Sequence, residues 1–136
     1  MENDTFDFDK SASYDYDVKK AFHLRAKRQL RRVAKLMGIP KGTYEVRSNL
    51  GGIVVSGEVT LHSNTLYVRV FQPAGYERAE ILYRTCKGQE DYTGGRNNVL
   101  PGNELNDASK VAVVLMRFLL SRGCNAAERL QARLNP

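Results

Sequence analysis

The sequence predicts an α+β fold with an N-terminal basic helix, a four-stranded antiparallel meander, and a C-terminal helix plus a short final helix. Two patterns lead to this expectation: apolar residues recur at helical spacing over residues 15–37, and four strand-like runs bounded by turn residues follow them. Helices on one face of a meander would leave the other face to solvent. At 136 residues the chain suits a single domain, expected over residues 13–136 after a mobile acidic tail over residues 1–12.

The predicted first helix is amphipathic. Val18, Phe22 and Ala26 begin an apolar stripe that continues at helical spacing to Met37. Gly38 is expected to end the helix, since glycine favours the residue after a helix C-cap. Basic side chains fall on the opposite side, and Arg25 and Arg32 lie at its margin. The opposite side carries Lys20, Lys27, Arg28, Arg31 and Lys35.

The four predicted strands cover residues 44–50, 53–62, 65–72 and 79–86. The second alternates cleanly, so Ile53 and Val55 are expected to face inward with the later apolar positions. Ser63-Asn64 is expected to form a two-residue hairpin loop. In the third strand an outward row carries Tyr67, Arg69 and Phe71.

The C-terminal third is expected to begin with a polar loop over residues 87–98. A helix capped by Asn106 or Asp107 then runs to about Arg122. Because this helix is apolar on nearly all sides, it is predicted to be central in the fold. A short final helix is expected to start at Asn125.

The formal charge of +6 is unevenly distributed along the chain. Residues 1–17 hold six acids and one base, residues 18–44 hold nine bases and no acid, and the remainder has a net charge of +2. Such a cluster indicates a contact surface for a polyanion or an acidic partner. A solvated helix face is the alternative interpretation. The acidic tail is expected either to complement the helix N-terminus or to screen the basic helix.

Signals for catalysis or metal binding are weak. The sequence has no nucleophile elbow, phosphate loop or zinc-protease motif, and Cys86 and Cys124 lie far apart. His23 and His62 are expected on the surface. No cofactor, metal or catalytic residue is therefore predicted. With no signal peptide and no apolar run long enough to span a bilayer, a cytoplasmic protein without membrane contact is expected.

Two further groups could bind a partner. Arg84, Lys87 and Arg96 flank a glycine-rich loop that could hold a phosphate, with the alternative that the loop only contacts a partner or caps the sheet. The outward row with Tyr67 and Arg69 could stack on nucleic-acid bases. A second subunit of a homodimer, or the tail, could cover that face instead.

The runs GGIVVSGEVTLH and LYVRVFQPAGYERAEILYRTCKGQEDYTGGRNN are similar to small accessory proteins of bacterial phages and mobile elements. This resemblance implies a non-enzymatic inhibitor of a host nucleoprotein defence complex, of anti-CRISPR type. Its partner would be a host defence protein or nucleoprotein complex. Alternatives are a free-standing DNA- or RNA-binding protein, and a nucleotide-binding sponge or small enzyme around residues 84–98. The candidate binding residues are Lys20, Lys27, Arg28, Arg31, Arg32, Lys35, Tyr67, Arg69, Arg84, Lys87 and Arg96.

Overall fold

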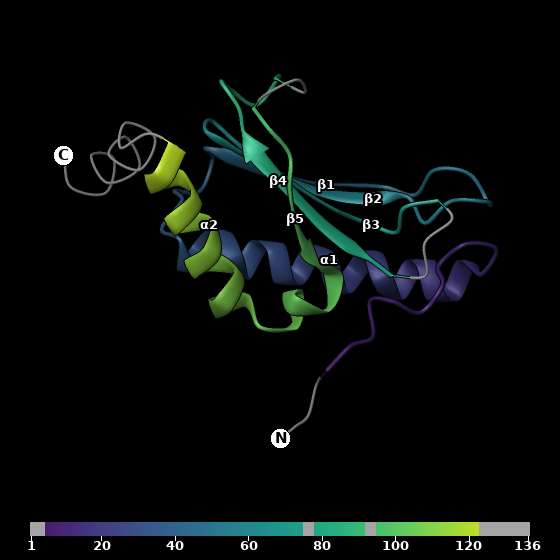
Figure 1. Cartoon of the computed structure of the whole chain (residues 1–136). Coiled ribbons are helices and arrows are strands. Elements are labelled where there is room, and N and C mark those ends of the chain that lie inside the picture. The colour runs from purple at the N-terminus through teal and green to yellow at the C-terminus, as the bar shows by residue number, and fades with distance from the viewer. Residues whose placement is uncertain (1–4, 75–77, 92–94, 123–136) are drawn as a thin grey trace.

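Helices pack on one face of an antiparallel sheet in the computed structural model of the chain, which describes residues 5–74, 78–91 and 95–122 (Figure 1). The described elements, in chain order, are α1 (Tyr16–Leu36), β1 (Tyr44–Asn49), β2 (Glu58–Ser63), β3 (Leu66–Phe71), β4 (Glu80–Thr85), β5 (Asn98–Pro101), the 3-10 helix η1 (Gly102–Asn106) and α2 (Ala108–Arg122). The sheet is a meander whose strands neighbour one another in sequence order. The predicted α+β class is confirmed, with five strands in these residues rather than four.

Local chemistry fixes both ends of α1. The Asp15 carboxylate accepts a hydrogen bond from the backbone N–H of Val18 at 3.1 Å, which satisfies a donor at the first turn. At the other end Gly38 has a φ of 75°, and the N–H of Ile39 donates back to the carbonyl of Ala34 at 3.0 Å. This left-handed cap is a common helix stop. The predicted bounds of 15–37 therefore differ from the observed ones by a single residue at each end.

The core lies between α1, α2 and the inner face of the sheet. Val59, Val70, Ile81 and Leu100 are neighbours in register across four strands, and the first three are fully buried. Phe22 and other buried residues of α1 complete the same apolar cluster. A continuous core of this kind holds α1 rigidly against the sheet, so its outward side chains project from a fixed scaffold.

The β1–β2 connection departs from the predicted second strand. β2 begins at Glu58 instead of residue 53, and Ile53, Val54 and Val55 are exposed in the connecting loop. Gly57 explains the break, because its φ is 72° and a Cβ there would collide with the carbonyl oxygen of Asn49. The expectation that Ile53 and Val55 face inward is wrong.

Two other parts of the sheet differ from expectation. Asn98–Pro101, which begins at the last residue of the predicted loop and was not predicted as a strand, pairs with β4 as the short strand β5. Its proline is tolerated because β5 is the last strand of the sheet. The β2–β3 turn consists of Asn64 and Thr65, one residue later than predicted, and the Ser63 hydroxyl accepts a hydrogen bond from the N–H of Leu66 at 3.0 Å.

Residues 5–12 pack against the body of the protein. Phe8 is fully buried, and its ring meets those of Phe6 and Phe22 edge to face, with centroids 4.8 and 5.5 Å apart. The N–H groups of Phe6 and Phe8 donate to the side chains of Asn106 and Asn103. Within the tail expected to be mobile over residues 1–12, the described residues 5–12 are thus held against the body through Phe6 and Phe8.

Only one face of α2 is buried. Val111, Leu115 and Leu119 are fully buried, whereas Val113 and Leu120 are about half exposed. The helix predicted to be central in the fold therefore packs on the core through one face and leaves part of its apolar surface exposed. The predicted final helix lies outside the described residues. Within residues 5–74, 78–91 and 95–122, no helix combines the length and apolarity needed to cross a membrane.

Candidate binding surfaces

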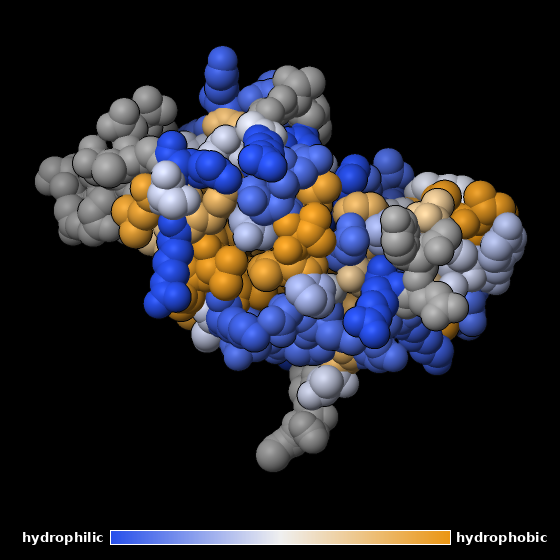
Figure 2. Space-filling view, viewed as in Figure 1, coloured by the Kyte–Doolittle hydropathy of each residue, from blue (hydrophilic) through white to orange (hydrophobic). Residues whose placement is uncertain are grey.

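The basic face of α1 is a charged surface that runs along most of the helix. It consists of six sequence-predicted residues, Lys20, Lys27, Arg28, Arg31, Arg32 and Lys35, and hydrophilic side chains line the helix in Figure 2. All six are exposed except Lys27, which is half-buried. From Lys20 to Lys35 the row spans about 22 Å at the α-helical rise of about 1.5 Å per residue.

Three of these six bases have no partner within the described part of the protein. There, the side chains of Lys27, Arg31 and Lys35 form no hydrogen bond or ion pair. The helix itself contributes a single acid, Asp17, at its first turn. The positive charges therefore create a positive potential along the helix, and this potential attracts an anionic partner along the length of α1.

The opposite side of α1 holds the β1–β2 loop through two buried polar side chains. Lys19 is only 5% exposed, and its ammonium donates to the carbonyls of Leu50 at 3.1 Å and Gly52 at 2.7 Å. One turn later, His23 Nε2 lies 2.8 Å from the Ser56 carbonyl and Nδ1 lies 2.7 Å from the Ser48 hydroxyl. Because a carbonyl can only accept, Nε2 carries the proton and donates, and Nδ1 accepts from the hydroxyl.

Burial lowers the pKa of His23 from 6.5, and the nearby positive charges of Lys19 and Lys27 lower it further, against the opposing effect of the Ser56 carbonyl. The neutral ring is therefore the form that holds the loop at neutral pH. His62 is also buried, and burial likewise lowers its pKa. The expectation of two surface histidines is wrong for both.

The loop held in this way carries an apolar tip. Ile53, Val54 and Val55 are 70, 56 and 43% exposed. Beside it lies a cleft of about 380 Å³, lined by residues 14–16, Lys19 and residues 50–53. The apolar tip was not predicted, because residues 53–55 were assigned to a strand. The glycines on both sides of these residues, in GGIVVSG, are the signal that could have indicated a loop.

The outer face of the sheet, where the sequence offered either a stacking strip or a covered surface, is covered at Tyr67. The Arg84 guanidinium lies 4.2 Å from the ring centroid of Tyr67, which is 4% exposed and also meets the edge of His62. Arg69 similarly lies over Phe71 at 4.1 Å and pairs with a glutamate of β2. A nucleic-acid base could stack on Tyr67 only by displacing Arg84, because the ring is already covered.

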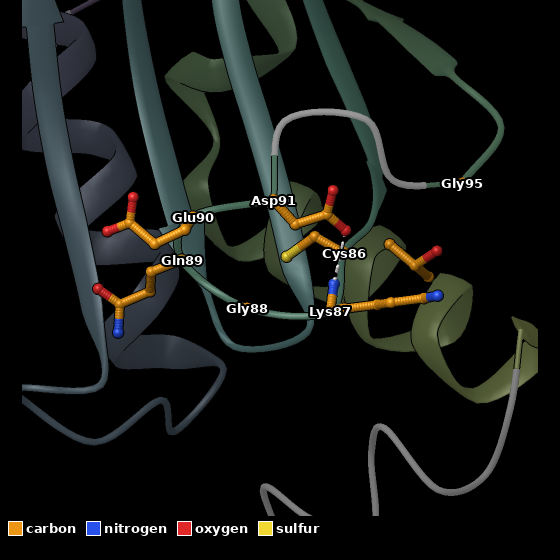
Figure 3. A pocket seen from close by; sticks show the side chains of 8 residues that line it. Cys86, Lys87, Gly88, Gln89, Glu90, Asp91 and Gly95 are labelled. Atoms are coloured by element: carbon orange, nitrogen blue, oxygen red, sulfur yellow. Dashed lines mark hydrogen bonds between the residues drawn. The ribbon is translucent and has the colours of Figure 1, made fainter.

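The loop after β4 borders an open cavity of about 760 Å³, lined by residues 85–91 and Gly95 (Figure 3). Asp91 accepts a hydrogen bond from the Lys87 N–H at 2.9 Å, while the Glu90 side chain points away from it. Of the three bases predicted to hold a phosphate, only Lys87 lines this cavity; Arg84 stacks on Tyr67 and Arg96 is exposed. Among the described residues, the three bases are therefore not brought together around this cavity.

Neither a metal centre nor a cysteine nucleophile is indicated in this loop. No group of three or more metal-ligating side chains occurs within the described ranges. Burial raises the pKa of the Cys86 thiol, which keeps it protonated and poorly nucleophilic. Cys124 falls outside the described residues.

Comparison of the chain with protein-family models, curated proteins and solved structures found no match. The geometry and chemistry of the surfaces are therefore the ground for assigning a function. Two surfaces stand out: the basic face of α1, and the apolar tip beside its N-terminal end.

Proposed function

We propose that this protein is a non-enzymatic binding protein that docks the basic face of α1 onto a nucleoprotein complex and thereby inhibits it. The observation that carries this proposal is the row of bases, about 22 Å long, on a helix anchored along its opposite side in the core. A pre-formed helix binds without the entropic cost of ordering its charges. A nucleoprotein complex suits this row because it presents both phosphates and acidic protein grooves.

The proposed target is a complex of a host defence system, with the protein acting as a phage or mobile-element accessory of anti-CRISPR type. This part of the proposal rests on the resemblance suggested for residues 51–62 and 66–98, and the comparisons with known proteins add nothing to it. An inhibitor by occlusion needs a stable scaffold and a charged contact surface, and the fold supplies both. Its site of action would be the bacterial cytoplasm.

Affinity capture from a bacterial lysate tests this function. The bait is the full chain, compared with K27E/R31E/K35E and with a control, K10E/R78E/R117E, that removes the same charge from exposed positions outside α1. A nucleoprotein complex retained by the wild type and the control, but not by the α1 variant, is the expected result. Equal retention by all three would contradict the proposal, since the basic face of α1 would then be dispensable for binding.

A free-standing nucleic-acid-binding protein is the second candidate, favoured by the same row of bases. About five phosphate contacts would make the logarithm of the affinity fall with the logarithm of salt concentration at a slope of roughly −4 to −5. A gel shift with duplex DNA and RNA at low salt separates the two candidates. Absence of any shift would eliminate the free-standing nucleic-acid-binding protein. Binding to nucleic acid alone, with a steep salt dependence, would favour it over the inhibitor.

A further inference from the structure

We propose that the apolar tip and the cleft beside it form an anchor site for an acidic protein segment that carries a bulky apolar side chain. The anchor site is defined by Tyr14, Tyr16 and residues 50–55, and it rests on the proposed function because it extends the basic face of α1. The segment would place its apolar residue in the cleft and its carboxylates on the bases of α1.

Apolar surface is concentrated at the anchor site. Tyr14 and Tyr16 are 71 and 64% exposed, and they border the exposed aliphatic residues of the loop. Figure 2 shows an apolar group at the end of the molecule where the β1–β2 loop projects in Figure 1. Contiguous apolar patches rimmed by polar residues mark interaction sites, because they gain free energy when a partner removes them from water.

The protein holds this surface in a fixed shape. The N–H of Tyr14 donates to the Ile53 carbonyl at 2.8 Å, and the buried Lys19 and His23 side chains bind the loop backbone from α1. Burying an ammonium group is unfavourable unless it is well hydrogen-bonded, and two carbonyls accept from Lys19. The tip is therefore pre-organised, which lowers the entropy lost on binding.

The anchor site is also continuous with the basic face. Tyr16, which lines the cleft, lies one turn before Lys20, and the exposed Leu24 lies one turn after it. Residues four apart on a helix share one side, so apolar and basic groups alternate along a single surface. An apolar core with a charged rim is the usual anatomy of a protein–protein interface.

The chemistry of the site favours a protein over the other anionic partners. A phosphate backbone offers little apolar surface to three aliphatic side chains, so bare nucleic acid would leave the tip in water. A bilayer presents negative headgroups over its whole surface, so it cannot keep them away from Asp15, which lines the cleft, and Asp17. A protein segment can instead place an apolar residue there and its carboxylates farther along α1. An acidic protein segment meets both the aliphatic and the basic groups.

The test uses a labelled synthetic helix with leucines and glutamates along the same face, and a comparator with the leucines replaced by serines. Fluorescence anisotropy is expected to show about tenfold tighter binding of the leucine helix to the full chain, the size of effect that a few buried methylenes produce. The variant I53S/V54S should abolish this preference. The control V99S/V113S, which makes matched changes at exposed positions of β5 and α2, should retain it.

Equal binding of the two helices, or no binding of either, would overturn the anchor site, as would a preference that survives in I53S/V54S. Tighter binding of duplex DNA, or of phosphatidylglycerol vesicles, that depends on Ile53 and Val54 would overturn the assignment to a protein segment. A different result would contradict the proposed function. If K27E/R31E/K35E bound the serine helix as tightly as the wild type does, the basic face of α1 would not contribute to binding, whatever the result for I53S/V54S.

Discussion

Replacement of Phe8 by alanine tests whether residues 5–12 belong to the folded body. The ring is fully buried and makes edge-to-face contacts with Phe6 and Phe22. Truncation of a buried phenylalanine to alanine lowers the free energy of unfolding by about 3–5 kcal/mol, because transfer and cavity effects add. Each aromatic pair accounts for about 0.5–1.5 kcal/mol beyond area burial. We therefore expect F8A to lower the free energy of unfolding by about 3–5 kcal/mol.

Urea denaturation followed by circular dichroism measures this loss at equilibrium. Y14A is the control, since Tyr14 lies only six residues later and is 71% exposed; its free energy of unfolding should change by less than about 1 kcal/mol. A loss below about 1 kcal/mol for F8A would refute the reasoning. It would mean that residues 5–12 detach with little effect on the core, as a mobile tail would.

Three further predictions concern the fold. L115A should lower the free energy of unfolding by about 2–5 kcal/mol, because Leu115 of α2 is fully buried in the core; a near-neutral urea midpoint would contradict this. G57A should destabilise the protein by more than about 1 kcal/mol, since Gly57 has a φ of 72° and the added methyl group would collide with the Asn49 carbonyl oxygen. G42A is the control, because Gly42 also has a positive φ, 86°, but open space around it, and it should cost less. Equal losses would show that the collision at Gly57 has no effect and only the positive φ matters. Burial lowers the pKa of His23 below 6.5, so the unfolded chain takes up a proton before the native chain does, and the free energy of unfolding should fall as the pH drops below about 6.5. H23Q should weaken that dependence between pH 7.5 and 5.5, with His62 leaving a residual slope; an unchanged slope would contradict the assignment.

The helical part of the fold could be predicted because its signals are local. The apolar spacing of α1, the Asp15 cap and the Gly38 stop all lie within or beside the helix. The alternation of β3 and its pairing with β2 follow similarly from neighbouring residues. The basic face of α1 was predicted for the same reason: helical spacing alone places Lys27, Arg31 and Lys35 together.

The parts that sequence reasoning missed depend on distant contacts. Residues 53–55 alternate into β2 without a break, and only the left-handed Gly57 and the hydrogen bonds from Lys19 and His23 turn them out of the sheet. Phe8 is buried by Phe22 and held by Asn103, which lies 95 residues away in the chain. No window of neighbouring residues contains these contacts.

On the outer face of the sheet, too, the sequence could not predict a contact between residues that are distant in the chain. Alternation correctly placed Tyr67 and Arg69 on one face, but it gave no indication that Arg84 from the next strand covers the Tyr67 ring. Cross-strand stacking depends on the register of β3 against β4, which the sequence does not specify by itself. A predicted binding residue can thus face outward and still be buried.

The most direct test of the central claim is to map lysine reactivity on the captured complex. Acetylation of exposed lysines, quantified by mass spectrometry, reports which side chains the partner covers. Docking through the basic face of α1 predicts strong protection of Lys20, Lys27 and Lys35 in the complex, with Lys10 and Lys87 as reactive as in the free protein. Unchanged reactivity of the three α1 lysines in a complex that protects Lys10 or Lys87 would contradict docking through this face.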